Sequence, residues 1–303
     1  MRHIRKHVSK SSTMTRPTIQ KDLEGRILRE RHVKPFLKWA GGKSHLLPQL
    51  RSLVLKQYDK YMEPFLGGGA LFFDLRPNRA VISDLNSELI NCYIVVRDSP
   101  YELLEQLKGI PVNSKTYYRI RKRDPKKLND IERAARLVYL NKTCYNGLYR
   151  VNKRGQFNTP YGKNDNARVY TPKNILRASK ALRSADILQG DFEPILLNYA
   201  SCGDFIYLDP PYPPTARYSD FTRYTSNFFY KKDHLRLAKV VEELDNRNCR
   251  FALSNAKHPL VLKIYSKYKK IEVKAPRYIS SRGDGRGNVS EILITNISME
   301  KEA

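Results

Sequence analysis

The sequence lacks long uncharged hydrophobic runs, and its few cysteines are far apart. No run approaches the ~18 apolar residues of a membrane-spanning helix, and the mean hydropathy is −0.59, so we expect no membrane association. The chain has four cysteines: Cys92, Cys144, Cys202 and Cys249. Because they form no CxxC pair, they predict neither a zinc site nor a disulfide framework. Reduced thiols in the cytoplasm fit this spacing best.

Acidic residues are also scarce, since 30 Asp and Glu stand against 56 Lys and Arg, a formal net charge of +26 over 303 residues. Residues 1–21 contain no acid, and this stretch has no apolar core like that of a secretory signal. We interpret residues 1–33 as a basic, disordered tail, with a transit peptide as the alternative. A charge of this size says little about fold, but its usual partner is a polyanion, most often nucleic acid.

The pattern of apolar residues predicts an α/β fold with a parallel sheet. Residues 61–66 form an apolar run that leads into glycines 67–69, as in a strand, a glycine turn and a helix. A second strand over residues 80–83 ends on Asp84, and a helix is expected from Ser87, which completes the opening of a βαβ unit. Later strands are expected over residues 204–208, 250–254, 271–274 and 291–295.

A basic segment interrupts this pattern. Apolar residues at helical spacing predict a helix within residues 130–141, and Asn146-Gly147 predicts a turn before a β-hairpin over residues 148–158. Tyrosines lie among its basic residues and favour nucleic acid: Tyr117, Tyr118, Tyr145, Tyr149 and Tyr161. We therefore predict a doubly wound sheet domain and an inserted domain, with these bounds: residues 34–97 and 187–303 for the first, residues 98–186 for the second.

Asp209-Pro210-Pro211-Tyr212 directly follows a strand that reads as buried on both faces. Open α/β sheets bind ligands at this edge, and each residue before a proline is confined to extended geometry. The Asp209 carboxylate and the Pro210 carbonyl can then accept both hydrogens of an exocyclic amine while Tyr212 stacks on a planar base. Such contacts would aim the lone pair of adenine N6 at an electrophile. The alternative is a simple turn that ends a strand.

Two other segments suggest a cofactor that contains a nucleoside. Glycines 67–69 let a ligand approach the backbone closely, and Asp84 ends the next strand, where such folds place an acid for ribose hydroxyls. A tight turn and a surface aspartate are the alternative. Residues 38–44 do not form a Walker A loop, because Leu37 stands where that motif needs glycine. The glycines and lysine of this segment can still approach a carboxylate or phosphate.

Four motifs in this order resemble those of the Dam-like DNA adenine-N6 methyltransferases. The family has a KWAGGK-type loop, a PFxGGG turn, an NGLxR…GxFNxPxG hairpin and DPPY; the matching stretches here are residues 38–43, 64–69, 146–162 and 209–212. The resemblance extends from about residue 35 to residue 296. It implies a Rossmann-like methyltransferase sheet with an inserted helical and β-hairpin target-recognition domain. It also implies S-adenosylmethionine as methyl donor, no metal, and double-stranded DNA as substrate.

The resemblance also assigns roles to individual residues. The flipped adenine would be held by Asp209, Pro210 and Tyr212. The methyl donor would be bound by Trp39, Gly41, Gly42, Lys43, Phe65, Gly67, Asp84, Asp191 and Asp209, with Asp84 at its ribose and Asp191 at its adenine. Base contacts would come from Leu148, Arg150 and Pro160, and a guanine contact from Lys38. The basic hairpin tip adds Lys153 and Arg154 as further DNA-binding residues.

The best-known relatives recognise GATC, and we expect that target here. One position departs from their pattern, because Asn164 stands where those enzymes carry an aromatic residue. We expect a monomer in a prokaryotic or phage-infected cell, with a cognate restriction endonuclease as a candidate partner. A role for a phage or for the host chromosome is the alternative to restriction–modification.

Rival activities differ at the first position of the DPPY motif. N4-cytosine methyltransferases typically have Ser there, and glutamine methyltransferases that act on proteins have Asn, whereas this chain has Asp209. An RNA adenine methyltransferase is a further alternative. A DNA-binding protein that has kept the fold without the activity is another, and S-adenosylmethionine binding would distinguish it.

Overall fold

The computed structural model describes residues 33–54, 57–213, 229–276 and 288–297. The basic tail expected over residues 1–33 lies outside the described residues except for Val33. All helices and strands of the described residues belong to one compact unit, Val33–Ala303.

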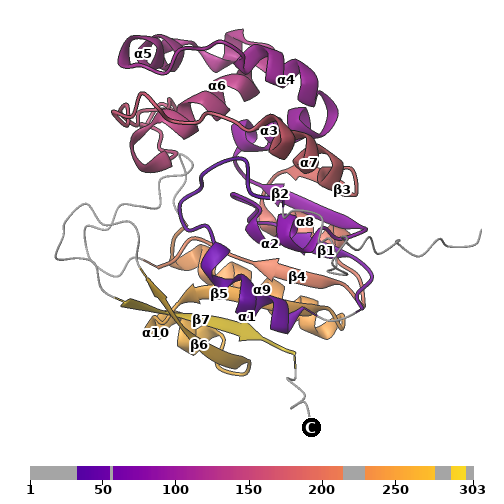
Figure 1. The fold of residues 1–303 in the computed structure, drawn as a ribbon. Helices are drawn as coiled ribbons and strands as arrows, with labels where there is room; N and C mark the ends of the chain where they lie inside the picture. The colour runs from indigo at the N-terminus through magenta and orange to yellow at the C-terminus, as the bar shows by residue number, and fades with distance from the viewer. Residues whose placement is uncertain (1–32, 55–56, 214–228, 277–287, 298–303) are drawn as a thin grey trace, which may run out of the picture. The chain divides into compact units, whose positions relative to one another are not determined.

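A seven-stranded sheet forms the centre of the described part, in the order β3-β2-β1-β4-β5-β7-β6 (Figure 1). The strands are β1 (Tyr61–Glu63), β2 (Ala80–Asp84), β3 (Ala185–Gln189), β4 (Phe205–Leu208), β5 (Arg250–Ala256), β6 (Lys269–Pro276) and β7 (Asn288–Thr295). Strands β1 to β5 pair in parallel, whereas β7 is antiparallel to both β5 and β6. The doubly wound α/β sheet is therefore confirmed, although β3 was not predicted.

The strand order reverses between β1 and β4, which are neighbours in the sheet. On one side of this point the sheet continues from β1 through β2 to β3. On the other side it continues from β4 through β5 and β7 to β6. In open α/β sheets such a topological switch point leaves a crevice beyond the carboxyl ends of the two strands, where ligands bind. The glycine turn follows β1, and the DPPY segment follows β4, so the fold brings these two motifs to the same edge.

Helices cover both faces of the sheet, as the alternation of buried residues requires. Tyr61 and Phe205 enter one hydrophobic cluster, and their neighbours Met62 and Ile206 enter the other. The helices are α1 (Leu47–Leu53), α2 (Ala70–Leu75), α3 (Ser87–Asp98), α4 (Pro100–Leu107), α5 (Ser114–Lys122), α6 (Asp130–Thr143), α7 (Pro172–Leu182), α8 (Phe192–Tyr199), α9 (Lys231–Asn246) and α10 (Pro259–Ile264). Residues of α8, α9 and α10 belong to the second cluster, and those of α1, α2, α3 and α6 to the first.

The predicted insertion, residues 98–186, contains a short hairpin, the helix α7 that follows it, and the three helices that precede it, α4, α5 and α6. Figure 1 shows these three helices together at the top of the view, beyond α3 and α7. The hairpin consists of one antiparallel bridge between Val151 and Phe157, with Asn152 N–H donating to the Gln156 carbonyl at 2.9 Å. The helix and hairpin predicted here are confirmed. The first cluster runs without a break from α3 into α6, so the division into two domains stays a prediction.

Candidate active site and nucleic-acid interface

The Asp209 carboxylate lies just beyond β4, and two side chains hold the same one of its oxygens. Lys43 Nζ is 2.9 Å from Asp209 Oδ1, and Ser254 Oγ on β5 donates to that oxygen at 2.7 Å. Ser254 is fully buried and lies 3.1 Å from the Tyr207 hydroxyl. The Asp209 side chain remains 19% exposed, so it is fixed in position and still reachable from solvent.

Lys43 is buried, although it comes from the short loop of residues 38–43. Its ammonium group also donates to the Gly41 carbonyl and lies 4.8 Å from the centre of the Tyr212 ring, within range of a cation–π contact. A buried ammonium group is costly unless an opposite charge compensates it, and Asp209 supplies that charge. The sequence did not predict this pairing, and the expected contact of Lys43 with the donor stays a prediction.

Trp39 packs on the glycine turn that follows β1. Gly67 has a φ of +49°, and a Cβ at this position would lie 2.8 Å from Trp39 Cδ1. Both the backbone angle and the close approach therefore favour glycine. The Trp39 ring also stacks on that of Tyr149, with centres 5.1 Å apart and planes 24° apart. The loop that carries Trp39 and Lys43 thus lies against the turn at the switch point.

Asp84 ends β2 and accepts two backbone hydrogen bonds. Its Oδ2 accepts from Gly67 N–H at 3.0 Å, and its Oδ1 accepts from Asn86 N–H at 2.9 Å. Burial raises the pKa of Asp84, while these backbone bonds lower it. The carboxylate therefore fixes the glycine turn next to β2. Its predicted contact with ribose hydroxyls stays a prediction.

Asp191 lies beside Asp84, because Gly190 N–H donates to the Asp84 carbonyl at 3.1 Å. Its Oδ1 caps α8 by accepting from Glu193 N–H at 3.0 Å, and its Oδ2 accepts from Arg236 of α9 at 2.7 Å. The Phe65 ring lies 5.4 Å from that of Phe192, the residue after Asp191. Phe65, Asp84 and Asp191 therefore meet at one edge of the sheet, while their contacts with a donor stay a prediction.

Glu63, at the end of β1, was missed in the sequence. Its side chain is buried, with 2% of the residue exposed, and its Oε2 accepts from the Tyr61 hydroxyl at 2.8 Å. The pKa of Glu63 is raised to about 8, mainly by burial and to a smaller extent by the nearby Asp209 and Asp84, against the effect of the Tyr61 bond. The carboxyl is therefore mainly protonated at pH 7. A charged residue within an otherwise apolar strand is the feature of the sequence that could have identified Glu63.

Asn141 on α6 was also missed, and it ties the loop of residues 38–43 to the hairpin. This residue is fully buried. Its Oδ1 accepts from Lys38 N–H at 2.8 Å, and its Nδ2 donates to the Lys38 carbonyl at 2.7 Å and to the Gly147 carbonyl at 3.2 Å. Asn146 and Gly147 have φ values of 54° and 65°, which match the left-handed turn that an Asn-Gly pair favours.

The hairpin directs most of its predicted DNA-binding residues toward solvent. The side chain of Lys38 lies along its first turn, since a Cβ on Gly147 would be 2.5 Å from Lys38 Cδ. Arg150 Nε donates to Asn158 Oδ1 at 2.8 Å. The exposed residues are Lys38, Arg150, Lys153, Arg154 and Pro160, with Leu148 half-buried. The structure therefore gathers all six predicted DNA-binding residues on the hairpin and the adjoining loop.

Three of the five tyrosines that lie among the basic residues are buried and are not available to contact nucleic acid. Tyr117, Tyr149 and Tyr161 are at most 8% exposed and belong to the first hydrophobic cluster. They therefore stabilise the inserted segment from inside. Two remain at the surface: Tyr118 at 38% exposure and Tyr145 at 50%.

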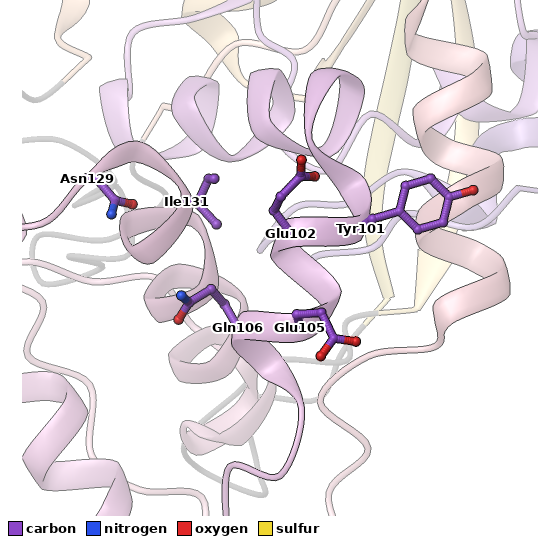
Figure 2. A pocket seen from close by; sticks show the side chains of 6 residues that line it. All are labelled: Tyr101, Glu102, Glu105, Gln106, Asn129 and Ile131. Carbon is purple, nitrogen blue, oxygen red and sulfur yellow. The ribbon is translucent and has the colours of Figure 1, made fainter.

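A separate pocket of about 540 Å³ lies between α4 and the start of α6 (Figure 2). It is lined by Tyr101, Glu102, Glu105, Gln106, Asn129 and Ile131, none of which is a predicted site residue. Within the described ranges, no three or more His, Cys, Asp or Glu side chains are grouped to hold a metal ion. No helix of the described part is long and apolar enough to cross a membrane.

Comparison with known proteins identifies the family. Residues 39–279 match the D12 class N6 adenine-specific DNA methyltransferases. The chain is 42% identical over 273 residues to the Type II methyltransferase M1.LlaDCHI of Lactococcus lactis subsp. cremoris, covering 88% of this chain and 96% of the relative.

Two further relatives support the same family assignment. The Type II methyltransferase M.MjaIII of Methanocaldococcus jannaschii is 40% identical over 287 residues, covering 87% of this chain and 99% of its own length. The DNA adenine methylase of Escherichia coli is 32% identical over 265 residues, covering 86% of this chain and 94% of the relative. This chain therefore belongs to the D12 class of N6 adenine-specific DNA methyltransferases.

Proposed function

We propose that this enzyme transfers a methyl group from S-adenosylmethionine to N6 of an adenine that has been rotated out of duplex DNA. The observation that carries the proposal is the Asp209 carboxylate, held through one oxygen by Lys43 and Ser254 at the switch point. Flipping follows from geometry, because an amine paired inside a duplex is out of reach of a donor in a protein crevice. The names of the relatives, a DNA adenine methylase and Type II methyltransferases, support the same substrate.

The role of Asp209 is to orient the target amine. Since Lys43 and Ser254 both contact Oδ1, we assign Oδ2 to one N6 hydrogen and the Pro210 carbonyl to the other. Accepting both hydrogens favours a pyramidal nitrogen and aims its lone pair at the methyl carbon. The new N–C bond forms as the S–C bond breaks, with its electron pair passing to sulfur, and N6 gives up a proton to Asp209. We assign Tyr212 to stacking on the adenine ring.

The residues at the carboxyl ends of β1, β2 and β3 fit a nucleoside that carries positive charge. Trp39 packs against Gly67 at this edge and offers a ring beside it, and the carboxyl groups of Asp84 and Asp209 both lie near Glu63 at the end of β1. When bound, S-adenosylmethionine supplies a methyl group activated by a sulfonium, so no metal is required. Asp84 is assigned to the ribose and Asp191 to the adenine; the methionine end is assigned to Trp39, Gly41, Gly42, Lys43, Phe65 and Gly67.

The inserted segment, residues 98–186, is proposed as the DNA-recognition domain, and residues 34–97 with 187–303 as the catalytic domain. A two-stranded ribbon fits the major groove, where Arg can pair with guanine, and Arg150 is exposed on this hairpin. Leu148 and Pro160 complete the base contacts, and Lys38 reaches a guanine. Lys153 and Arg154 contact phosphates without reading sequence, as does the basic tail.

We propose GATC as the target site, a monomer as the working form, and a cognate restriction endonuclease as a partner in the cell. The endonuclease is supported by the two relatives named as Type II methyltransferases. A monomer suffices because methylating one adenine needs one active site.

The test is methyl transfer from labelled S-adenosylmethionine into two duplexes that differ only by one GATC site, followed by identification of the modified base. N6-methyladenine in the GATC duplex alone is the expected result. Label in both duplexes would discard the site but keep the reaction. Label on cytosine, or in RNA of the same sequence but not in DNA, would overturn the proposal in favour of a rival activity. The Asp209→Asn variant serves as the inactive control.

A further inference from the structure

Tyr149 occupies an unusual place in the hairpin, between two residues that are assigned to base contacts. Its neighbours Leu148 and Arg150 are half-buried and exposed, whereas Tyr149 is only 8% exposed. In extended backbone, successive side chains point to opposite sides. The side chain of Tyr149 therefore points away from the surface that would meet DNA and into the protein.

At its inner end, Tyr149 contacts one residue of the proposed donor site, Trp39, and Asn86, which is bonded to another, Asp84. Its ring stacks on Trp39 at 5.1 Å, and Trp39 in turn lies against Gly67. A side-chain hydrogen bond joins Tyr149 to Asn86. Asn86 is the residue whose backbone N–H is held by Asp84 at 2.9 Å. One hairpin side chain thus reaches both the glycine turn and the residue beside the proposed ribose ligand.

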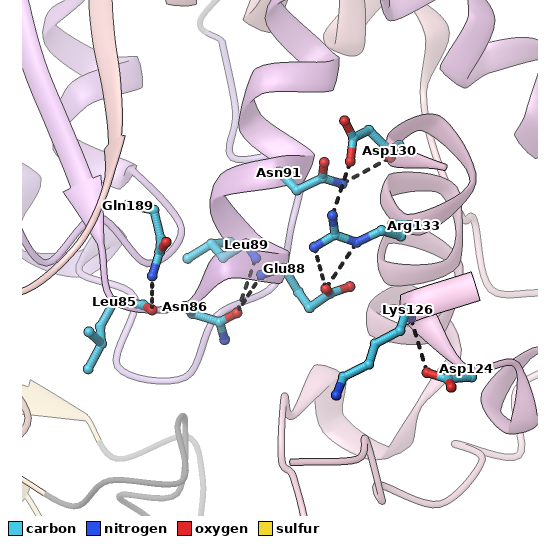
Figure 3. Close-up of polar contacts among 10 residues, drawn as sticks. All are labelled: Leu85, Asn86, Glu88, Leu89, Asn91, Asp124, Lys126, Asp130, Arg133 and Gln189. Atoms are coloured by element: carbon cyan, nitrogen blue, oxygen red, sulfur yellow. Dashed lines mark hydrogen bonds and ion pairs between the residues drawn. The ribbon is translucent and has the colours of Figure 1, made fainter. Parts of the chain in front are cut away.

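The geometry of Asn86 shows which group donates to Tyr149. Asn86 Oδ1 caps α3 by accepting from Glu88 N–H and Leu89 N–H, each at 3.1 Å (Figure 3). Because the oxygen of Asn86 is directed at the start of the helix, we assign its amide N–H as the donor to the phenol oxygen. Consistent with this direction, the bond to Asn86 lowers the pKa of Tyr149, against burial, which raises it to about 12.

Close to Asn86, α6 is fastened to α3 by an ion pair and a hydrogen bond. Figure 3 shows Arg133 of α6 between two carboxylates, with Nη2 donating to Glu88 Oε1 at 2.6 Å and Nη1 to Asp130 Oδ1 at 3.0 Å. Asn91 Nδ2 donates to the Asp130 carbonyl at 2.9 Å. These bonds hold α3 and α6 together near Asn86, and the Tyr149 side chain is what joins the hairpin to Trp39 and Asn86.

We infer that Tyr149 is a positioning residue through which the hairpin, when it engages DNA, sets the shape of the donor site. The inference rests on the proposed function, because it takes Trp39, Gly67 and Asp84 as the donor site and the hairpin as the DNA reader. Binding at the two sites is then coupled, and by linkage each ligand changes the affinity for the other by the same factor. Couplings of about 5- to 150-fold are typical of two sites in one protein.

The experiment measures the dissociation constant of S-adenosylhomocysteine by calorimetry, with and without a saturating GATC duplex. The ratio of the two constants is the coupling. In the unmodified enzyme DNA should tighten binding by about tenfold. Tyr149→Leu loses both contacts and should bring the ratio close to one. Tyr149→Phe keeps the stacked ring, loses the bond to Asn86, and should give an intermediate ratio. Tyr101→Leu is the matched control, since Tyr101 lies in the same insertion, 68% exposed, and should leave the ratio unchanged.

A second readout does not depend on the donor. Trp39 is the single tryptophan of the sequence, so its emission reports directly on the stacked pair. Adding duplex DNA alone should change this emission in the unmodified enzyme and in Tyr101→Leu. The change should be absent in Tyr149→Leu. Circular dichroism verifies folding, and if the Leu variant does not fold, Tyr149→Phe must still lower the coupling ratio at least about twofold.

The outcomes separate this inference from the proposed function. The role of Tyr149 would be overturned if Tyr149→Leu kept the coupling ratio of the unmodified enzyme. If only Tyr149→Phe folds, an unchanged ratio in that variant would overturn it. Binding of both ligands by the unmodified enzyme with a ratio of one would also overturn it, while the proposed function would stand. Failure of the unmodified enzyme to bind S-adenosylhomocysteine at all would instead overturn the proposed function.

Discussion

The sheet edge at the switch point and the recognition hairpin place their proposed functional side chains in opposite ways. At the edge, Lys43 and Ser254 are buried around an Asp209 that keeps 19% of its side-chain exposure. On the hairpin, Arg150, Lys153 and Arg154 are exposed, and the buried residues lie beneath them. The edge therefore has polar groups fixed before any ligand arrives, whereas the hairpin offers charges that water still surrounds.

Because of this difference, the two regions are suited to different tasks. Fixed dipoles and charges in a partly dry site stabilise a transition state without reorganising. Exposed cations interact weakly at any one contact and are screened by salt, which suits reversible binding to a long polyanion. Substitutions at the edge should therefore affect the rate of methyl transfer, and substitutions on the hairpin should affect affinity, site preference and salt dependence.

The largest effect is expected from Asp209→Asn. The amide retains the shape of the side chain but presents N–H groups where N6 needs an acceptor, so single-turnover transfer should fall by about 10³-fold. Binding of S-adenosylhomocysteine should change little. Near-normal turnover would remove Asp209 from the chemistry and end the contrast between the two regions.

On the hairpin, Arg150→Ala should have the strongest effect. A bidentate arginine–guanine contact contributes about 1–3 kcal/mol of discrimination against a wrong base. Affinity for the cognate duplex should fall about tenfold or more while binding to unrelated duplexes changes little. Competition binding with single-base variants of the site measures this. An equal loss on every sequence would make Arg150 a phosphate contact.

Ser254→Ala tests how much the fixed orientation of Asp209 contributes. A hydrogen bond to a charged group stabilises by about 1.5–3 kcal/mol, so transfer should fall at least about tenfold, with the site preference unchanged. Ser266→Ala is the matched control, because Ser266 is exposed and lies in the turn before β6, the edge strand of the sheet. A change in site preference without a change in rate would contradict the assignment of Ser254 to the edge.

The double variant Lys153→Ala with Arg154→Ala should have a smaller and more uniform effect. Affinity should fall a few-fold on every duplex, and the slope of log affinity against log salt should decrease by about two, one for each phosphate contact. Titrations at several salt concentrations test this. An unchanged salt slope would exclude both residues from the DNA contact.

The smallest effect on transfer is expected from Glu63→Gln, whose consequence is for stability. The pKa of Glu63 is raised to about 8 in the folded protein from 4.5, so between these values the unfolded chain releases a proton that the folded chain keeps. Its contribution to stability is therefore present below pH 4.5 and lost as pH rises toward 8. The loss is a few kcal/mol, at about 1.4 kcal/mol per pKa unit. The free energy of unfolding, measured with denaturant at pH 5, 6.5 and 8, should decline less with rising pH in Glu63→Gln than in the unmodified enzyme. An equal decline in the two proteins would contradict the burial of a neutral carboxyl.

Much of the fold and of the site was predictable because local signals agreed with the global arrangement. Apolar runs marked β1, β2 and β4, and the motifs directly after them necessarily met at the carboxyl edge. Strand β3 was missed because it alternates between buried and exposed residues and carries Asp186, which weakens the apolar run.

The contacts that hold the site could not be predicted from the sequence, because they join residues that are far apart along the chain. Lys38 and Asn141 are 103 positions apart, and Ser254 lies 45 positions beyond Asp209. A polar residue in a helix or strand shows that a buried polar contact exists, but only packing determines its partner. Tyr149 illustrates the same limit, since a tyrosine among basic residues suggested a surface role and the structure buried it.

The bond between Lys38 and Asn141 also has a consequence for the order in which the molecule is made. The loop of residues 38–43 is synthesised first, yet the Asn141 side chain that bonds the Lys38 backbone follows 103 residues later, and Asp209 and Ser254 come later still. Closing such long segments costs entropy that is recovered only when the partner is in place. A growing chain therefore has no assembled active site until β5 has been synthesised.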